Sequence, residues 1–358
     1  MVGRASLRTF RSYVELDLPL EPGLVLVTGA NGAGKTNLLE ALHVGSQGFS
    51  PRTRAEPRLV RLGEAAARVG LAGSEGGAPV ETEVTIVPRE GKRIRLNGAA
   101  LASAETLRTR LAALVFTPDR LAVVKGGPLV RRTYVDRMLG RVFPAQALLP
   151  SEYARALAQR NEALRRTRAG SSSPEAVEPW THRLVELGSD LDAARGRLVS
   201  ALAPGFRAHA AALGLAQASL VYEERGLALE ELERRLPRDL ERGTTGAGPH
   251  LRDVEIRSGE RELRGFGSQG EQRVAVLALL LAEAALLAER RPSPPLLLLD
   301  DVLSELDRQR RASLLARLPA AGQAVLTSTS PDALPAGAEP SLVVRVRREG
   351  DASVAQAG

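Results

Sequence analysis

The chain has 358 residues, of which 44% are hydrophobic and 25% charged, which fits a globular protein with one large or two modest domains. It contains no cysteine, which excludes a disulfide framework, a thiolate metal site and a cysteine nucleophile, and favours a reducing compartment. The formal net charge of +7 fits an anionic partner such as nucleic acid, but a compositional bias towards arginine explains it equally well.

No segment of the sequence is suited to secretion or to crossing a membrane. The first residues lack the long apolar run of a signal peptide. The most apolar stretch, residues 274–288, is shorter than the roughly 20 residues that a membrane span needs, and it contains Glu283. We therefore expect a buried helix there, and a cytoplasmic protein that does not associate with a membrane.

The first third of the chain predicts strands around one helix. Residues 5–18 indicate a short strand, and residues 24–27 are a β-rich run that leads into a glycine-rich turn. Residues 37–44 indicate a helix. Residues 80–87 alternate apolar and polar side chains, as a half-buried strand does, and Asn97 followed by glycine is a hairpin signal. An antiparallel β-subdomain is expected in this part of the chain.

The middle of the chain changes to a helical pattern. Residues 152–168 and 180–202 place apolar side chains at helical spacing, and the Gly/Ser/Pro-containing segment 169–174 between them reads as a loop. Neither helix sustains several heptads, which excludes a long coiled coil. Strand-like sequence returns at residues 253–256, after the Gly/Thr-rich stretch 243–249.

The strongest motif follows the strand expected at residues 24–27. It is a glycine-rich loop, residues 29–36, directly before the helix expected at residues 37–44. Its glycines let backbone amides point at phosphate oxygens, and the N-terminus of the following helix attracts the same negative charge. We expect the loop to bind ATP, with Lys35 on the β- and γ-phosphates as a catalytic residue and the Thr36 hydroxyl on Mg²⁺. The motif reads Gly29-Ala30-Asn31-Gly32-Ala33-Gly34-Lys35-Thr36 and matches G-x-x-x-x-G-K-[ST].

A second motif is an apolar run, residues 296–299, that ends in two acids, Asp300 and Asp301. A strand this hydrophobic is expected in the centre of a parallel sheet, with its end beside the phosphate loop. There Asp300 would hold Mg²⁺ directly or through water. Asp301 would be the catalytic residue that orients or deprotonates the attacking water.

Two further motifs resemble those of ABC-type ATPases. Ser268-Gln269-Gly270 stand before a long apolar helix, with Ser268 at the N-cap position, and resemble the signature that contacts the γ-phosphate of ATP held by the opposite subunit. They precede the acidic strand, which is the order found in that class. Ser304 and Asp307 follow the acids and resemble the D-loop, which crosses the dimer interface.

These motifs predict the α/β fold of an ABC-type ATPase head, with a mixed sheet around the phosphate loop, an antiparallel β-subdomain, an inserted helical lobe and no long coiled coil. We expect residues 1–120 to form the N-terminal part of the ATPase domain with Walker A. Residues 241–358 would form its C-terminal part with the signature, Walker B and D-loop. Residues 121–240 would be the inserted, mainly helical lobe. The spacing from Lys35 to Ser268 is far longer than a compact transporter nucleotide-binding domain needs.

Along nearly its whole length the chain resembles the RecF family of recombination mediators. The resemblance implies an ATP-dependent homodimer that clamps double-stranded or gapped DNA and releases it on slow, DNA-stimulated hydrolysis. It also implies roles in DNA repair, replication, recombination and the SOS response, with partners of the RecO and RecR kind. Besides the motifs above, it rests on Phe116-Thr117-Pro118-Asp119, Arg131-Arg132, Arg160-Asn161 and Gly248-Pro249-His250.

Some of the residues that carry this resemblance could have a structural role instead of a functional one. Arg131 and Arg132 are candidates for contact with the DNA backbone, but each could equally be a solvated or structurally paired arginine. The chain departs from the family at residues 251–253 and at Glu271, where glutamine is usual, so contacts made by those positions are not transferred.

Two other functions stay open at this stage. A transporter subunit or other partner-driving ATPase would have no use for DNA. A non-enzymatic ATP-gated scaffold is suggested by Asp301, where many relatives have glutamate, and by Thr329, where transporters usually have a histidine. The aromatic content of 3% is low for stacking on bases, which favours contact with a duplex backbone.

Overall fold

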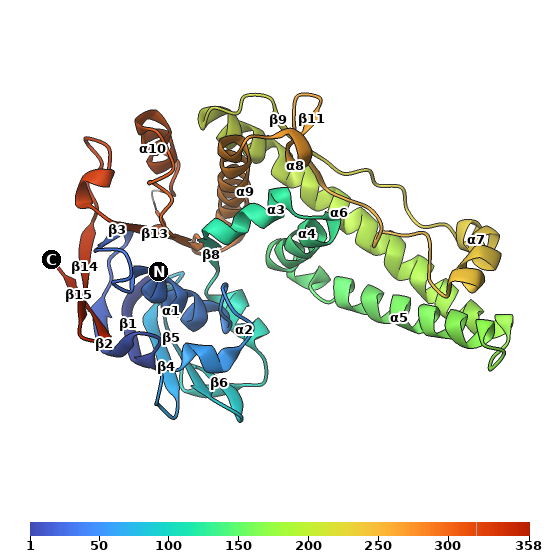
Figure 1. Ribbon diagram of the computed structural model, residues 1–358, viewed down its shortest axis with the longest axis horizontal. Helices are drawn as coiled ribbons and strands as arrows, with labels where there is room; N and C mark the ends of the chain where they lie inside the picture. The colour runs from blue at the N-terminus through green and yellow to red at the C-terminus, as the bar shows by residue number, and fades with distance from the viewer. Residues whose placement is uncertain (320) are drawn as a thin grey trace. The chain divides into compact units, whose positions relative to one another are not determined.

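The computed structural model describes residues 1–319 and 321–358 (Figure 1), and this part of the chain divides into two compact units. Residues 241–276, which we expected with the ATPase domain, pack mostly with the second unit. Because compact packing alone does not define a domain, the three-part organisation stays a prediction. Unit 1 contains Met1–Arg120, His209–Gly214 and Leu277–Gly358, and unit 2 contains Leu121–Ala208 and Leu215–Val276.

The centre of unit 1 is a mixed sheet in the order β15-β14-β3-β13-β12-β8, in which only the pairing of β14 with β15 is antiparallel among the described strands. All four residues of β12 are buried, as expected of a central parallel strand. The α/β fold with a mixed sheet is therefore confirmed. The strands are β3 (Gly23–Thr28), β8 (Ala113–Phe116), β12 (Leu296–Leu299), β13 (Gln323–Ser328), β14 (Leu342–Glu349) and β15 (Ala352–Ala357).

A second, antiparallel sheet of unit 1 has the order β2-β1-β4-β5-β6-β7. The single strand expected over residues 5–18 was wrong, because the chain turns there and forms a hairpin with φ of 53° at Arg11. The Asn-Gly hairpin was right: Asn97 has φ of 49° and Gly98 of 80° between β6 and β7. The strands are β1 (Val2–Phe10), β2 (Tyr13–Pro19), β4 (Ala67–Glu75), β5 (Ala78–Val87), β6 (Gly91–Leu96) and β7 (Ala99–Leu101).

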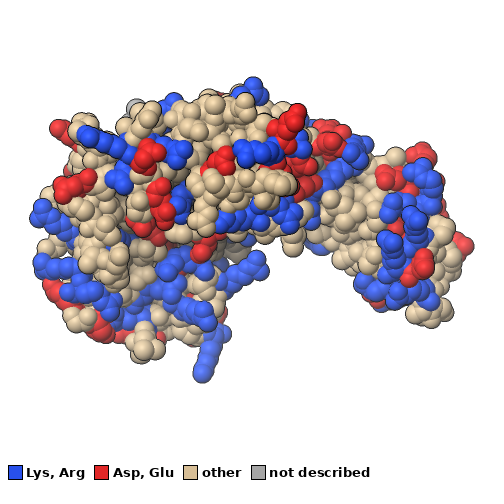
Figure 2. Space-filling model, turned by 45° about the horizontal axis from the view of Figure 1, so that its top comes forward, with Lys and Arg blue, Asp and Glu red and all other residues tan. Residues whose placement is uncertain are grey.

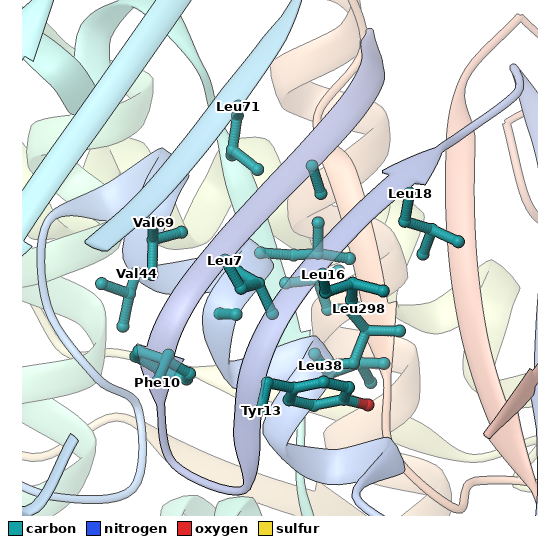
Figure 3. Packing of buried hydrophobic residues seen from close by; sticks show 14 of the residues in the cluster. Leu7, Phe10, Tyr13, Leu16, Leu18, Leu38, Val44, Val69, Leu71 and Leu298 are labelled. Atoms are coloured by element: carbon teal, nitrogen blue, oxygen red, sulfur yellow. The ribbon is translucent and has the colours of Figure 1, made fainter. Parts of the chain in front are cut away.

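The core of unit 1 joins these two sheets through helix α1 (Lys35–Gln47). Figure 3 shows Leu38 and Val44 of α1 among apolar side chains from β1, β2, β4 and β12. Tyr13 is fully buried in this core, and its hydroxyl donates to the carbonyl oxygen of Gly34 at 3.1 Å. The phosphate loop is thus anchored directly to the core. Other helices of unit 1 are η1 (Glu56–Leu59), α2 (Ala104–Arg110), α10 (Arg308–Leu315) and η5 (Pro331–Ala333).

Unit 2 is mainly helical, with a small sheet in the order β11-β10-β9. Its helix α7 packs Leu236 and Leu240 against Ala163, Leu164 and Val177. Across residues 1–319 and 321–358 no helix is both long and apolar enough to cross a membrane. The elements are α3 (Ala122–Lys125), α4 (Pro128–Val142), η3 (Pro144–Gln146), α5 (Leu149–Arg168), η4 (Pro174–Val177), β9 (Ala218–Val221), α7 (Leu229–Arg242), β10 (Glu255–Ser258), β11 (Arg261–Glu262) and α8 (Leu263–Phe266). Three elements have residues in both units: η2 (Pro118–Leu121), α6 (Glu178–Ala212) and α9 (Gln269–Arg290).

Candidate nucleotide-binding site

The phosphate loop joins the end of β3 to the start of α1. No side chain caps α1, whose N-cap residue is Gly34, so the first amides of the helix are available to an anion. The Lys35 ammonium folds back and donates to the carbonyl oxygens of Gly29, at 2.7 Å, and Ala30, at 2.9 Å. Lys35 is therefore placed over the loop by the loop's own backbone.

Two glycines of the loop are required by the way it is seated. Gly29 has φ of +154°, and a Cβ there would lie 2.1 Å from the carbonyl oxygen of Val346. Gly34 has φ of +117°, and a Cβ there would lie 2.3 Å from Oγ of Ser353. Ser353 in turn donates to the carbonyl oxygen of Ala33 at 2.6 Å. Strands β14 and β15 thus form the seat of the loop, a role that the sequence motif did not reveal.

The acidic strand end lies beside the loop, as its pattern predicted. The Thr36 hydroxyl is 3.0 Å from each carboxylate oxygen of Asp300 and donates to this carboxylate. Parallel pairing of β12 with β13 also brings Thr327 to Asp300, and its hydroxyl donates to Oδ1 at 2.8 Å. Asp300 is buried, with 8% exposure, and is held from two sides.

Asp301 follows at the point where the chain leaves the sheet. Its φ of 48° lies in the left-handed region, which costs a non-glycine residue about 1 kcal/mol. The amide of Asp301 donates to the Thr327 hydroxyl at 2.8 Å, and its carbonyl oxygen accepts from the Ser304 hydroxyl at 3.0 Å. Its side chain is exposed. One hydroxyl, that of Thr327, therefore connects both acids, and sequence reasoning did not single it out.

The positive charge of Lys35 lies near the negative charges of Asp300 and Asp301. Burial lowers the pKa of the Lys35 ammonium, while the negative charges of Asp301 and Asp300 oppose this shift. The site therefore concentrates one cation and two anions at one end of the sheet.

The signature segment lies in unit 2, where it starts helix α9. The Ser268 hydroxyl accepts from the amide of Glu271 at 3.2 Å, and the Glu271 carboxylate accepts from the amide of Ser268 at 2.8 Å. This reciprocal pair is a capping box, for which the pattern S-x-x-E was visible in the sequence. Gln269 and Gly270 lie between the two. Glu271 thus has a structural role as the second member of the capping box, and glutamine at this position could form the same hydrogen bond.

The D-loop residues also serve a local structure. Asp307 is the N-cap of α10, and its side chain accepts from the amide of Arg310 at 2.8 Å. Asp307 and Ser304 are both exposed. Thr329, at the position of the transporter histidine, is exposed just beyond β13.

Arg131 and Arg132, the two candidates for DNA contact, differ in their placement. Arg131 is only 2% exposed, and its guanidinium donates to the Asp253 carboxylate and to the carbonyl oxygens of Val124 and Gly126. A DNA contact through Arg131 does not fit this placement. Arg132 is half-buried and donates to the carbonyl oxygen of Arg252 at 2.7 Å, which leaves only part of its guanidinium at the surface.

Buried polar pairs continue through unit 2. Arg160 is fully buried and donates to Asp239 at 2.8 Å, and Asn161 accepts from the amide of Thr245 at 2.8 Å. His250 lies 2.6 Å from the Tyr153 hydroxyl, and burial lowers the pKa of its imidazole. These family-like residues therefore order the helical unit. Residues 251–253, where the sequence departs from the RecF pattern, also hold this unit together, since Arg252 pairs with Asp192 and Asp253 pairs with Arg131.

The residues at the loop fit ATP with Mg²⁺. The uncapped helix start and the Lys35 ammonium suit phosphate, while the hydroxyl of Thr36 and carboxylate of Asp300 are oxygen donors of the kind Mg²⁺ prefers. Within the described part of the chain no cluster of three His, Cys, Asp or Glu side chains is placed to hold a metal. A magnesium ion here would therefore take its other ligands from phosphate and water.

Comparison with known proteins agrees with this fold. The chain matches the family described as RecF/RecN/SMC N terminal domain over residues 1–350. A solved structure of an SMC head bound to the C-winged helix domain of ScpA has a TM-score of 0.62 at 17% identity, covers 99% of this chain and 97% of its own, and supports the fold alone. The fold and site thus define an ATP-binding head of the ABC/SMC type.

Two curated relatives, both named DNA replication and repair protein RecF, match more closely in sequence. The one from Heliobacterium modesticaldum is 36% identical over 90% of this chain and 90% of its own length. The one from Anaeromyxobacter dehalogenans is 39% identical over 89% and 90%. A solved structure of the recombination mediator protein RecF with ATP, in the RecFOR pathway, has a TM-score of 0.86 at 26% identity and covers 99% of this chain and 97% of its own. The chain belongs to the RecF family.

Proposed function

We propose that this chain is an ATP-dependent DNA-binding ATPase of recombinational repair and replication maintenance. The observation that carries the proposal is the approach of Thr36 to both carboxylate oxygens of Asp300, at 3.0 Å, beside a lysine held over the phosphate loop. The relatives named for DNA replication and repair, and the related RecF structure with ATP, supply the biological context.

The chain's own residues would divide the chemistry among them. Loop amides and Lys35 would bind the phosphates, and Thr36 with Asp300 would hold Mg²⁺, which screens phosphate charge when bound. Asp301, exposed beside this cation, would orient or deprotonate the attacking water.

The site as described lacks a second set of phosphate contacts, and we propose that another copy of the chain supplies them. Ser268 caps helix α9, and Gln269 and Gly270 form its first turn, whose amides that the capping box leaves unused could contact a phosphate. In an ATP-dependent homodimer with two-fold symmetry, this segment of one subunit would approach the phosphate loop of the other. Ser304 and Asp307 of the D-loop are exposed, as residues at such an interface must be.

Because Arg131 is buried, the candidates for DNA contact in the helical unit are arginines at its surface. Arg234, Arg238 and Arg242 are exposed and spaced four residues apart, so they form one stripe along α7. Arg168 of α5 donates to the carbonyl oxygen of Glu241 and so lies beside the stripe. Figure 2 shows arginines gathered on the part of unit 2 that contains α5 and α7.

The arginines of this stripe repel one another. Like charges four residues apart on a helix cost about 0.2–0.5 kcal/mol per pair, and in the described part of the chain none of Arg234, Arg238 and Arg242 is within ion-pair distance of an acid. We propose that the stripe contacts the phosphate backbone of duplex or gapped DNA. Clamping of the DNA would then require the dimer, and hydrolysis would release it. Partners of the RecO and RecR kind are proposed because the related RecF structure belongs to the RecFOR pathway.

The proposal is tested by sedimentation velocity and ATPase measurements with and without ATP and duplex DNA, at two salt concentrations. We expect an ATP-dependent dimer and a rate that DNA raises at low salt. Replacing Arg234 and Arg238 by glutamine should reduce the slope of log affinity against log salt by about 0.9 for each phosphate that is no longer neutralised. Arg93→Gln, which removes one positive charge from β6, is the control for each arginine replaced singly. A monomer under all conditions, or no DNA effect at low salt, contradicts the proposal.

A further inference from the structure

The helical unit has a groove that the ATPase chemistry does not use. It lies between η4, the first turn of α6 and the N-terminal half of α7, and has a volume of about 260 Å³. Small-molecule sites usually measure about 300–1,000 Å³, so this groove is better suited to one or two anchoring side chains than to a cofactor. Every residue that lines it belongs to unit 2.

The groove is lined at one point by a buried cation with an unused donor. Arg160 is 0% exposed, and its Nε donates to the Thr181 hydroxyl at 3.0 Å. Its Nη1 donates to Asp239 and to the Thr245 hydroxyl, both at 2.8 Å. Its Nη2 is buried and has no hydrogen-bond partner within the described chain. A buried guanidinium donor without a partner is costly, so Arg160 leaves an unsatisfied polar group behind this wall of the groove.

The walls of the groove are apolar. Leu232 and Val177 are buried, with 0% and 1% exposure, and form a fixed surface. Leu229 and Leu236 are only half-buried, so part of their apolar area faces the groove and water. An apolar side chain that enters the groove would cover this area, which is favourable in proportion to the area removed from water.

The rim of the groove is acidic, although the chain as a whole has a net charge of +7. Glu175, Glu178 and Glu233 line the groove and are all exposed. A hydrogen bond from Ser173 lowers the pKa of Glu175, which keeps this carboxylate charged at neutral pH. Three carboxylates repel a phosphate backbone and a free anion, and they attract lysine or arginine side chains.

We propose that this groove docks a basic segment of a partner protein, with a leucine or phenylalanine side chain in the groove and lysine or arginine on the acidic rim. The partner is a protein and not DNA, because the rim has the wrong charge for DNA. On a helix, Leu229, Glu233 and Leu236 lie on the face opposite Arg234, Arg238 and Arg242. Helix α7 can therefore hold this segment while its arginine stripe stays free.

The test uses the full chain without nucleotide, so that it does not depend on the proposed ATPase function. The probes are fluorescent synthetic peptides in which two apolar residues, either leucine or phenylalanine and three positions apart, are flanked by lysine pairs. Matched peptides have glutamate in place of lysine, or alanine in place of the apolar residues. We expect anisotropy titrations to show binding of the basic apolar peptides at low salt, and at least about tenfold weaker binding of both matched sets.

Variants of the chain distinguish binding in the groove from a general effect of charge on peptide binding. Glu233→Lys and Glu178→Lys are surface changes that leave the core intact, and each should weaken binding by about tenfold. Glu241→Lys is the matched control, because Glu241 is exposed on the same helix but does not line the groove. Leu229→Ser should weaken binding without affecting ATP hydrolysis.

Three results would overturn the proposal: no binding by any basic apolar peptide, equal binding by the acidic set, or equal losses from Glu233→Lys and Glu241→Lys. A change in self-association with Glu233→Lys, without a change in peptide binding, would assign the groove to a second copy of the chain instead. If the wild-type chain bound the peptides but did not hydrolyse ATP, the proposed ATPase function would be wrong and the docking proposal would be unaffected.

Discussion

Thr327→Val is the sharpest perturbation of the candidate site, because valine keeps the shape of threonine and removes only its hydroxyl. That hydroxyl donates to Asp300 at 2.8 Å and accepts from the amide of Asp301 at 2.8 Å, and Thr327 is 1% exposed. A hydrogen bond to a charged group is worth about 1.5–3 kcal/mol, and the part-buried amide of Asp301 adds less than the roughly 1–3 kcal/mol of a fully buried amide left unsatisfied. With partial relaxation, we expect the free energy of unfolding to fall by about 2–4 kcal/mol.

The same change should act on hydrolysis more than on ATP binding. The amide bond to Thr327 holds Asp301 at a φ of 48°, a conformation that costs about 1 kcal/mol. Without it, the productive placement of the Asp301 carboxylate becomes less populated, and each 1.4 kcal/mol corresponds to about a tenfold loss of rate. We expect kcat to fall by about ten- to a hundredfold and KM to change less, because Lys35 and the loop amides still bind the phosphates although Asp300 loses one of its two hydrogen-bond donors.

The assay is steady-state and single-turnover ATP hydrolysis, with urea unfolding for stability. Thr327→Ser is the matched control, since it keeps the hydroxyl and loses only a methyl group, worth about 0.8 kcal/mol. Hydrolysis by Thr327→Val at the wild-type rate, or an equal impairment of Thr327→Ser and Thr327→Val, would show that the Thr327 hydroxyl has no such role.

Three further results are expected. Asp301→Asn should slow single-turnover hydrolysis by about 10²–10⁴-fold and leave ATP affinity intact, and hydrolysis as fast as wild type would remove Asp301 from the mechanism. Glu271→Ala should lower the free energy of unfolding by about 0.5–2 kcal/mol through loss of the capping box, whereas Glu271→Gln should retain it, which urea titrations can compare. Burial lowers the pKa of His209 and His250 below the ordinary value of 6.5, so the unfolded chain binds more protons than the folded chain below about that pH. Stability should therefore be full above about pH 6.5 and fall as the pH drops, by up to about 1.4 kcal/mol per pH unit for each histidine, and a double His→Asn variant should flatten this profile.

Much of the nucleotide-binding unit could be predicted because its signals are local. A β-rich run before Gly29, and an apolar run before Asp300, each specify a strand and the residue at its end. Parallel pairing then brings the strand ends to the same edge of the sheet, where Thr36 meets Asp300 at 3.0 Å. The Asn97 hairpin was predictable for the same reason, since its turn needs residues that tolerate positive φ.

What the sequence did not reveal depends on contacts between distant residues. The seat of Gly34 against Ser353 joins positions more than three hundred residues apart, and no local pattern marks a serine for that purpose. The hairpin at Arg11 lacks the glycine or asparagine that usually announces a turn, so the segment read as one strand. Arg131 looked like a surface arginine because its partner Asp253 lies 122 residues further along.

The arginines of this chain therefore have two physically distinct uses, and net charge cannot separate them. Buried pairs such as Arg160 with Asp239 seldom stabilise a fold more than apolar residues of the same volume would, but removing one partner leaves an uncompensated charge and costs about 3–5 kcal/mol. Such pairs fix which helices meet. The exposed stripe on α7 does the opposite, because Arg234 and Arg238 repel each other and a bound anion would relieve this repulsion. Burial, and not charge, is thus the property that decides which arginines are available to DNA, and it places the most family-like of them inside the helical unit.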